Sequence, residues 1–108
     1  MAAASGLSPV EFMKQHSAET AAAFQALRKA VMASGPLDAH TCELITLGAL
    51  VTCESESSFK THARRLVRDR VPLAALRQAV FVTFGASTTF AQVNAGLQWI
   101  DEVAAESQ

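Results

Sequence analysis

The feature that most constrains this chain is a segment from His40 to Thr52 that is apolar on nearly every side. Leu44, Leu47 and Leu50 are spread around it, and Glu43 is the one acid that it contains. A helix with no polar face in a water-soluble protein is surrounded by other helices. The segment therefore predicts a buried central helix around which the rest of the chain is arranged.

Two helices are expected before this segment. Residues 1–7 are small and featureless and predict a disordered end. Ser8 and Glu11, with a proline between them, match a capping box at a helix start. Residues 16–34 are rich in strong helix formers, and Gly35-Pro36 ends that helix.

Three helices are expected after it. A polar turn at residues 54–58 leads into a helix over residues 58–70. The stretch from Leu73 to Phe84 keeps a helical spacing despite its strand-like residues, and Ser87 starts the last helix. No partner strand is visible elsewhere, so residues 1–108 predict an all-α single domain of about five to six helices.

Composition narrows the possible partners. Hydrophobic residues make up 50% of the 108 residues and charged residues 18%, so some apolar surface is expected to be covered by self-association. The net charge of −1 provides no field that would favour nucleic acid, and the basic cluster at residues 60–77 has no aromatic series.

The longest apolar run, residues 44–53, is about half the length of a membrane span. Without a secretory signal, the expectation is a cytoplasmic protein that binds neither membrane nor nucleic acid.

The two cysteines predict neither a disulfide nor a metal site. Cys42 and Cys53 fall in one expected helix and lie roughly 16 Å apart along it, whereas a disulfide needs Cα atoms within about 7 Å. They are expected to be small buried hydrophobic residues. No histidine or cysteine set has metal-site spacing, and no glycine-rich loop follows a strand, so no cofactor is expected.

The main candidates for catalytic residues are Glu43 and His62. A carboxylate in an apolar helix is costly unless it is paired or used. Glu43 lies roughly 17 Å before the turn and His62 roughly 10 Å after it, so direct contact and a bridge through Ser58 or water both remain open. A Glu–His pair can transfer protons, but it can equally act only as a hydrogen bond that locks the hairpin.

Glu43, Ser55, Ser58 and His62 have the spacing Glu-x11-Ser-x2-Ser-x3-His. This pattern resembles the Glu-x11-Cys-x2-Cys-x3-His motif of the carboxymuconolactone decarboxylase / AhpD-like family, with serine at both cysteine positions. The sequence over residues 37–103 is also similar to the family. The resemblance implies an AhpD-like helical bundle that assembles as a homotrimer or homohexamer.

The family that the sequence resembles includes two kinds of activity, and the residues at the motif positions distinguish between them. The peroxidase branch needs thiolates for thiol–disulfide exchange, which serine cannot supply, so AhpD-like peroxidase or antioxidant activity is disfavoured. The decarboxylase branch implies a lyase without the cysteine pair. In that branch Glu43 and His62 would be the catalytic acid–base groups acting on a small carboxylate or lactone. Ser55 and Ser58 would bind the substrate as hydroxyl donors at a helix start.

Two alternatives to the lyase stay open, a non-catalytic family member and redox chemistry at Cys53, and within the lyase hypothesis the cation that would hold the substrate carboxylate is undecided. A degenerate family member could be a non-catalytic oligomeric scaffold or ligand binder. Lys60, Arg64 and Arg65 are candidates for a substrate-binding cation, although a solvated or inter-subunit helix face is the favoured interpretation. Cys53 could be a displaced peroxidatic cysteine, but it lacks a resolving partner and is expected to be a core residue at a helix end.

Overall fold

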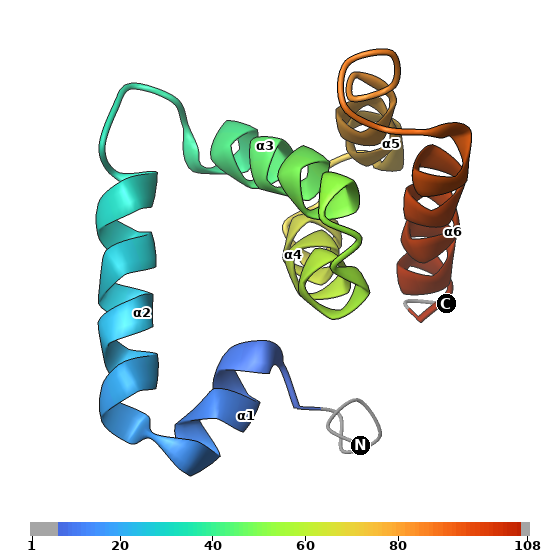
Figure 1. Cartoon of the computed structure of the whole chain (residues 1–108). Helices are drawn as coiled ribbons and strands as arrows, with labels where there is room; N and C mark the ends of the chain where they lie inside the picture. The colour runs from blue at the N-terminus through green and yellow to red at the C-terminus, as the bar shows by residue number, and fades with distance from the viewer. Residues whose placement is uncertain (1–6, 107–108) are drawn as a thin grey trace. The chain divides into compact units, whose positions relative to one another are not determined.

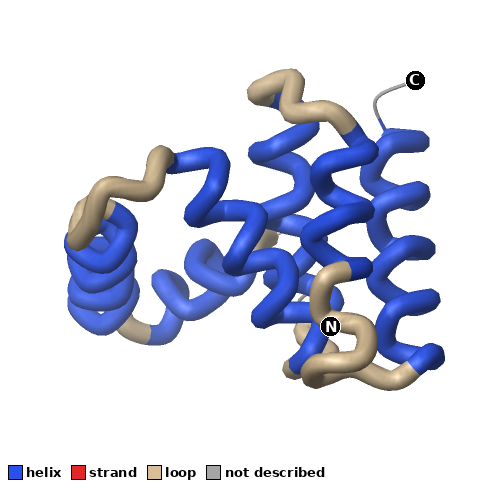
Figure 2. Tube along the Cα trace, turned by 90° about the horizontal axis from the view of Figure 1, so that it is seen from above, coloured by secondary structure: helices blue, strands red, loops and turns tan. Residues whose placement is uncertain are grey.

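The structure is a computed structural model that describes residues 7–106. These residues form six helices and no strand (Figures 1 and 2), which confirms the expected all-α class. The helices are α1 (Pro9–His16), α2 (Ala18–Met32), α3 (Ala39–Thr52), α4 (Glu56–Arg68), α5 (Leu73–Phe81) and α6 (Phe90–Glu106). Apart from Leu7, the end expected to be disordered lies outside the described residues. The chain divides into two compact units, residues 1–39 and residues 40–108.

The first unit holds the helix pair α1–α2. The capping box is confirmed, because Ser8 N donates to Glu11 Oε1 at 2.8 Å and Glu11 N donates to Ser8 Oγ at 3.2 Å. The helix expected over residues 16–34 is shorter than the composition suggests. Ser17 has an extended backbone and its hydroxyl accepts from Thr20 N at 3.1 Å, so α2 starts only at Ala18.

The second unit holds α3 to α6 and a continuous apolar core, in which α6 packs against α4 and α5. The Phe59 ring on α4 meets the Trp99 ring on α6 edge-on, with centroids 5.2 Å apart. Every helix of this unit contributes fully buried side chains, which are Leu47 and Val51 from α3, Phe59, Ala63 and Leu66 from α4, Leu76 and Val80 from α5, and Ile100 and Val103 from α6.

One glycine sets how closely these helices approach. A Cβ on Gly96 of α6 would lie 2.8 Å from Val51 Cγ2, which is closer than real Cβ atoms come, and 3.2 Å from Val80 Cγ1, which is a tight contact. The α6 backbone therefore lies directly on side chains of α3 and α5, and no other residue type fits there without a shift.

The helices that flank the site end in the same way. After α3, Glu54 N donates to Val51 O and Ser55 N donates to Leu50 O, with Glu54 in the left-handed region at φ 58°. This Schellman motif satisfies the last carbonyls of the helix. The same pair of hydrogen bonds follows α4, where Arg70 has φ 66°. Both positions favour glycine, yet both hold a charged residue.

The boundaries around residues 81–90 differ from the expectation. α5 ends at Phe81 instead of Phe84, and a turn with Gly85 at φ 86° follows. α6 begins at Phe90 and not at Ser87, because Thr89 is the residue that caps it. Thr89 Oγ1 accepts from Gln92 N at 3.2 Å, and Gln92 Oε1 accepts from Thr89 N at 2.8 Å.

Several large apolar side chains of the second unit remain exposed around the α5–α6 connection, namely Phe81, Val82, Phe84 and Phe90, with Ile45 on α3. The Phe84 and Phe90 rings pack edge-on at 4.7 Å. Within residues 7–106, none of the helices has the length and apolar character that crossing a bilayer requires.

Candidate active site

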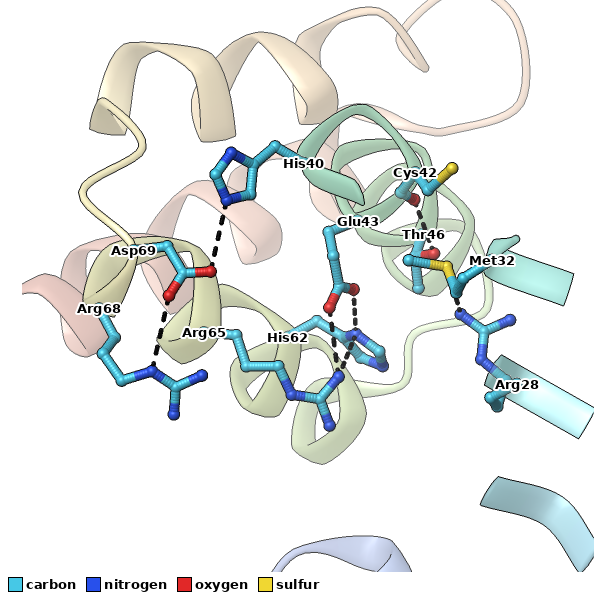
Figure 3. A network of polar contacts seen from close by, with 10 residues as sticks. All are labelled: Arg28, Met32, His40, Cys42, Glu43, Thr46, His62, Arg65, Arg68 and Asp69. Carbon is cyan, nitrogen blue, oxygen red and sulfur yellow. Dashed lines mark hydrogen bonds and ion pairs between the residues drawn. The ribbon is translucent and has the colours of Figure 1, made fainter. Parts of the chain in front are cut away.

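The Glu43 and His62 side chains are in direct contact. His62 Nδ1 on α4 lies 2.5 Å from Glu43 Oε1 on α3 (Figure 3). The two side chains are largely buried, with 12% of Glu43 and 17% of His62 exposed. Of the two possibilities that the sequence left open, direct contact is the one found, and no serine bridges the pair.

The apolar core fixes both side chains at this position. On α4, His62 lies between the buried residues Phe59 and Ala63, on the border of the apolar face. On α3, Glu43 lies one turn before Leu47, which is fully buried. Packing of these neighbours leaves the imidazole and the carboxylate directed at each other across the space between the two helices.

Arg65 is a third member of the cluster. Its Nη1 lies 3.2 Å from Glu43 Oε2 and 3.5 Å from His62 Nδ1. Arg65 follows His62 by three residues, so both lie on the same face of α4. Sequence reasoning left Arg65 among three cations chosen by proximity, although of the three only Arg65 has the spacing that places it on the His62 face of α4.

His62 and Arg65 together keep Glu43 ionised. Burial raises the pKa of Glu43, but the hydrogen bonds and positive charges of His62 and Arg65 outweigh burial and hold this pKa below its ordinary 4.5. An ionised carboxylate only accepts hydrogen bonds, so His62 Nδ1 must carry the hydrogen that lies between them. The other ring nitrogen of His62, Nε2, is then the atom that can exchange a proton with a bound molecule.

The other two candidate cations, Lys60 and Arg64, form ion pairs away from Glu43. Lys60 Nζ lies 2.8 Å from Glu56 and 2.5 Å from Glu102, which is on α6. Arg64 holds the carboxylate of Glu106, also on α6, through Nε at 2.8 Å and Nη2 at 2.9 Å. Lys60 and Arg64 are thus paired with acids of their own chain, whereas Arg65 contacts Glu43.

Ser55 and Ser58 lie at the start of α4. Ser55 is its N-cap residue, but its side chain makes no capping hydrogen bond. Ser58 precedes His62 by four residues and shares its helix face. In the described part of the chain, neither hydroxyl bonds to Glu43 or to His62, so the two serines line the same side of the helix without joining the cluster.

A second polar link between α3 and α4 escaped sequence reasoning. His40 Nε2 lies 3.3 Å from Asp69 Oδ2, and both side chains are about half exposed (Figure 3). The signal was present in the spacing. His40 precedes Glu43 by three residues, and Asp69 follows Arg65 by four, so each pair shares a helix face.

The cysteines differ from the expectation in one respect. Cys42 and Cys53 form no disulfide, and Cys42 is partly buried. Cys53 is exposed and is not a core residue, because α3 ends at Thr52 and the chain turns away there through Glu54. Over residues 7–106, no cluster of three histidine, cysteine or acidic side chains is arranged to hold a metal ion.

The second unit also contains an open, mainly apolar groove of about 440 Å³ between α3 and α5. Its walls include Leu44, Ile45, Ala79 and Val82, with Gly48 between them. Glu43 and His62 do not line it, so the groove is separate from the cluster.

Comparison with known proteins gives one match. A model of the carboxymuconolactone decarboxylase family matches residues 18–102, which is most of the chain and includes all four motif positions. Neither the curated proteins nor the solved structures include a match to this chain.

Proposed function

Because the chain belongs to the carboxymuconolactone decarboxylase family, we propose that it carries out non-redox acid–base chemistry on a small carboxylate or lactone. Glu43 and His62 are the catalytic pair. The observation that carries this proposal is the 2.5 Å contact between His62 Nδ1 and Glu43 Oε1 in a largely buried setting. A buried carboxylate that orients an imidazole is a common arrangement for proton transfer.

The proton step is assigned to His62 Nε2. When a lactone acid loses CO₂, the carbon–carbon bond to the carboxylate breaks and its electron pair moves into the system conjugated with the lactone carbonyl. A proton must then be delivered to carbon. Protonated His62 can supply it from Nε2, and Glu43 stabilises the imidazolium and fixes the ring orientation. Regaining a proton from water restores the pair.

Ser55 and Ser58 are proposed to bind the substrate. They lie on the His62 face at the start of α4, where backbone N–H groups lack helical partners and attract negative groups. Their hydroxyls can donate to a carbonyl or carboxylate oxygen but cannot replace the thiolates of a peroxidase. This arrangement supports the lyase over the antioxidant activity.

Self-association is part of the proposal. Phe81, Val82, Phe84 and Phe90 around the α5–α6 connection are exposed by 43–71%, and exposed apolar patches often mark surfaces that bind another protein. The family resemblance implies a homotrimer or homohexamer. Sedimentation of the purified chain distinguishes these states.

One observation favours a non-catalytic alternative. Glu43 is bonded to both His62 and Arg65, so the cluster could serve only to hold α3 to α4. A structural cluster predicts that its loss lowers stability, whereas a catalytic cluster predicts that its loss removes turnover in a folded protein.

The test is a turnover assay on lactones and small carboxylates selected by thermal shift, using wild type, Glu43→Gln and His62→Ala. His40→Ala is the matched control, since it removes a histidine–carboxylate link between the same two helices. The expected result is loss of turnover by about a hundredfold or more in the first two variants, with helicity and assembly retained. The control should keep its activity. Full activity in a folded His62→Ala variant would refute the proposal.

A further inference from the structure

Arg65 contacts the cluster through only one of its three guanidinium nitrogens. Its Nη1 is directed at Glu43, and within residues 7–106 its Nε and Nη2 have no hydrogen-bond partner. The Arg65 side chain is 47% exposed, and its Nε–Nη2 edge is turned away from Glu43 and His62 (Figure 3). Nε–H and Nη2–H are parallel donors at the spacing of the two oxygens of a carboxylate.

The neighbouring arginine shows what this edge can hold. Arg64 uses the same two atoms, Nε and Nη2, to bind both oxygens of Glu106, at 2.8 and 2.9 Å. Arg64 is thereby satisfied within the chain. The equivalent edge of Arg65 has the same chemistry, but no carboxylate from residues 7–106 lies on it.

The open edge lies beside the reactive part of the cluster. Arg65 Nη1 is 3.5 Å from His62 Nδ1, and only 17% of the His62 side chain and 12% of that of Glu43 are exposed. Arg65 is much more exposed than either, so it forms the solvent-facing border of the cluster. An anion on this edge would lie next to the imidazole.

We propose that the Nε–Nη2 edge of Arg65 is a carboxylate-binding site, which holds the ligand's anionic group while another part of the same ligand reaches His62. The proposal rests on the function proposed above and specifies its ligand. The bound carboxylate is one that the reaction leaves intact, because a bidentate ion pair stabilises the charged group and would oppose its departure as CO₂. The product therefore keeps the group by which it was bound.

The test uses the full chain, with sodium benzoate as the probe and benzamide as its uncharged match. Proton–nitrogen NMR follows the Arg65 Nε–Hε resonance and the His62 ring. Benzoate should shift both resonances saturably, and benzamide should not. Arg65→Gln should weaken benzoate binding about tenfold or more, because a hydrogen-bonded ion pair is lost. Arg65→Lys, which keeps the charge without the paired donors, should recover only part of the affinity.

Arg64→Gln is the control, since its guanidinium edge is already occupied by Glu106. It should bind benzoate as the wild type does. Absence of a saturable shift in the wild type, or equal binding by wild type and Arg65→Gln, would overturn the carboxylate site. Neither result affects the acid–base proposal, which is decided separately by the turnover of Glu43→Gln and His62→Ala.

Discussion

The side chains of Glu43 and His62 meet at 2.5 Å although 19 positions separate them in the sequence. Each comes from a different helix, and Arg65 holds the second oxygen of the same carboxylate at 3.2 Å. The carboxylate thus lies between two nitrogen groups of α4, an imidazole on one oxygen and a guanidinium on the other.

Glu43→Gln should lower the stability of the protein near neutral pH but not in acid. Burial raises the pKa of Glu43, and His62 and Arg65 more than reverse this, so the folded-state pKa is below 4.5. A carboxyl group with a lowered folded-state pKa stabilises the fold above its unfolded-state pKa, and this contribution is lost as the pH falls through the folded-state pKa. Thermal midpoints of the two proteins should therefore approach each other as the pH falls below the ordinary pKa of a glutamate side chain. A gap of constant size from pH 7 to pH 3 would contradict this.

Gly96→Ala should destabilise the protein by about 1–2 kcal/mol, even though alanine is the better helix former. The added methyl group would lie 2.8 Å from Val51 Cγ2, and both Val51 and Val80 are fully buried and stiff. Gly35→Ala is the control, because nothing lies within 4 Å of its Cβ position. Urea denaturation should show a lower midpoint only for Gly96→Ala, and equal midpoints for the two variants would argue against the close approach of α6.

Arg70→Gly should stabilise the protein by about 0.5–1 kcal/mol. Arg70 has φ 66° in the motif that ends α4, and glycine adopts this conformation without a steric penalty. Arg68→Gly, two residues earlier and inside the helix, should instead lower stability. Chemical denaturation of the two variants distinguishes a backbone effect from loss of an arginine charge, which both share.

The thiols should be dispensable for activity. Cys53 is exposed and Cys42 is partly buried, so iodoacetamide should label Cys53 first in the folded protein. Because the proposed chemistry uses no thiolate, Cys53→Ser should keep the turnover of the wild type. Loss of turnover in this variant, with the fold retained, would point to redox chemistry.

Local features were predictable from the sequence, whereas contacts between helices were not. The Ser8–Glu11 capping box depends on four consecutive residues, so its pattern is sufficient. The Thr89–Gln92 cap obeys the same rule, but Ser87 offered an equally plausible start two residues earlier. The exposure of Cys53 was missed because periodicity does not show where the last turn of a helix ends.

The sequence indicated that Glu43 and His62 belong to the candidate site, but not whether their side chains are in contact. Glu43 stood out as a carboxylate in an apolar helix, and the family motif pointed to His62. Helix rise alone placed them at unequal depths, which left direct contact undecided. The choice of Arg65 over Arg64 depends on how α4 is rotated between α3 and α6, and this rotation is set by the packing of Phe59, Ala63 and Leu66.

The short connection between α3 and α4 explains why the motif has a fixed length. Only Cys53, Glu54 and Ser55 separate the two helices, and the hydrogen bonds that end α3 leave this connection no slack. Inserting one residue into α4 between Phe59 and His62 would turn His62 by about 100° about the helix axis relative to the buried Phe59. His62 would then face away from Glu43, so the number of residues between them reflects the phase of a helix as much as the needs of a reaction.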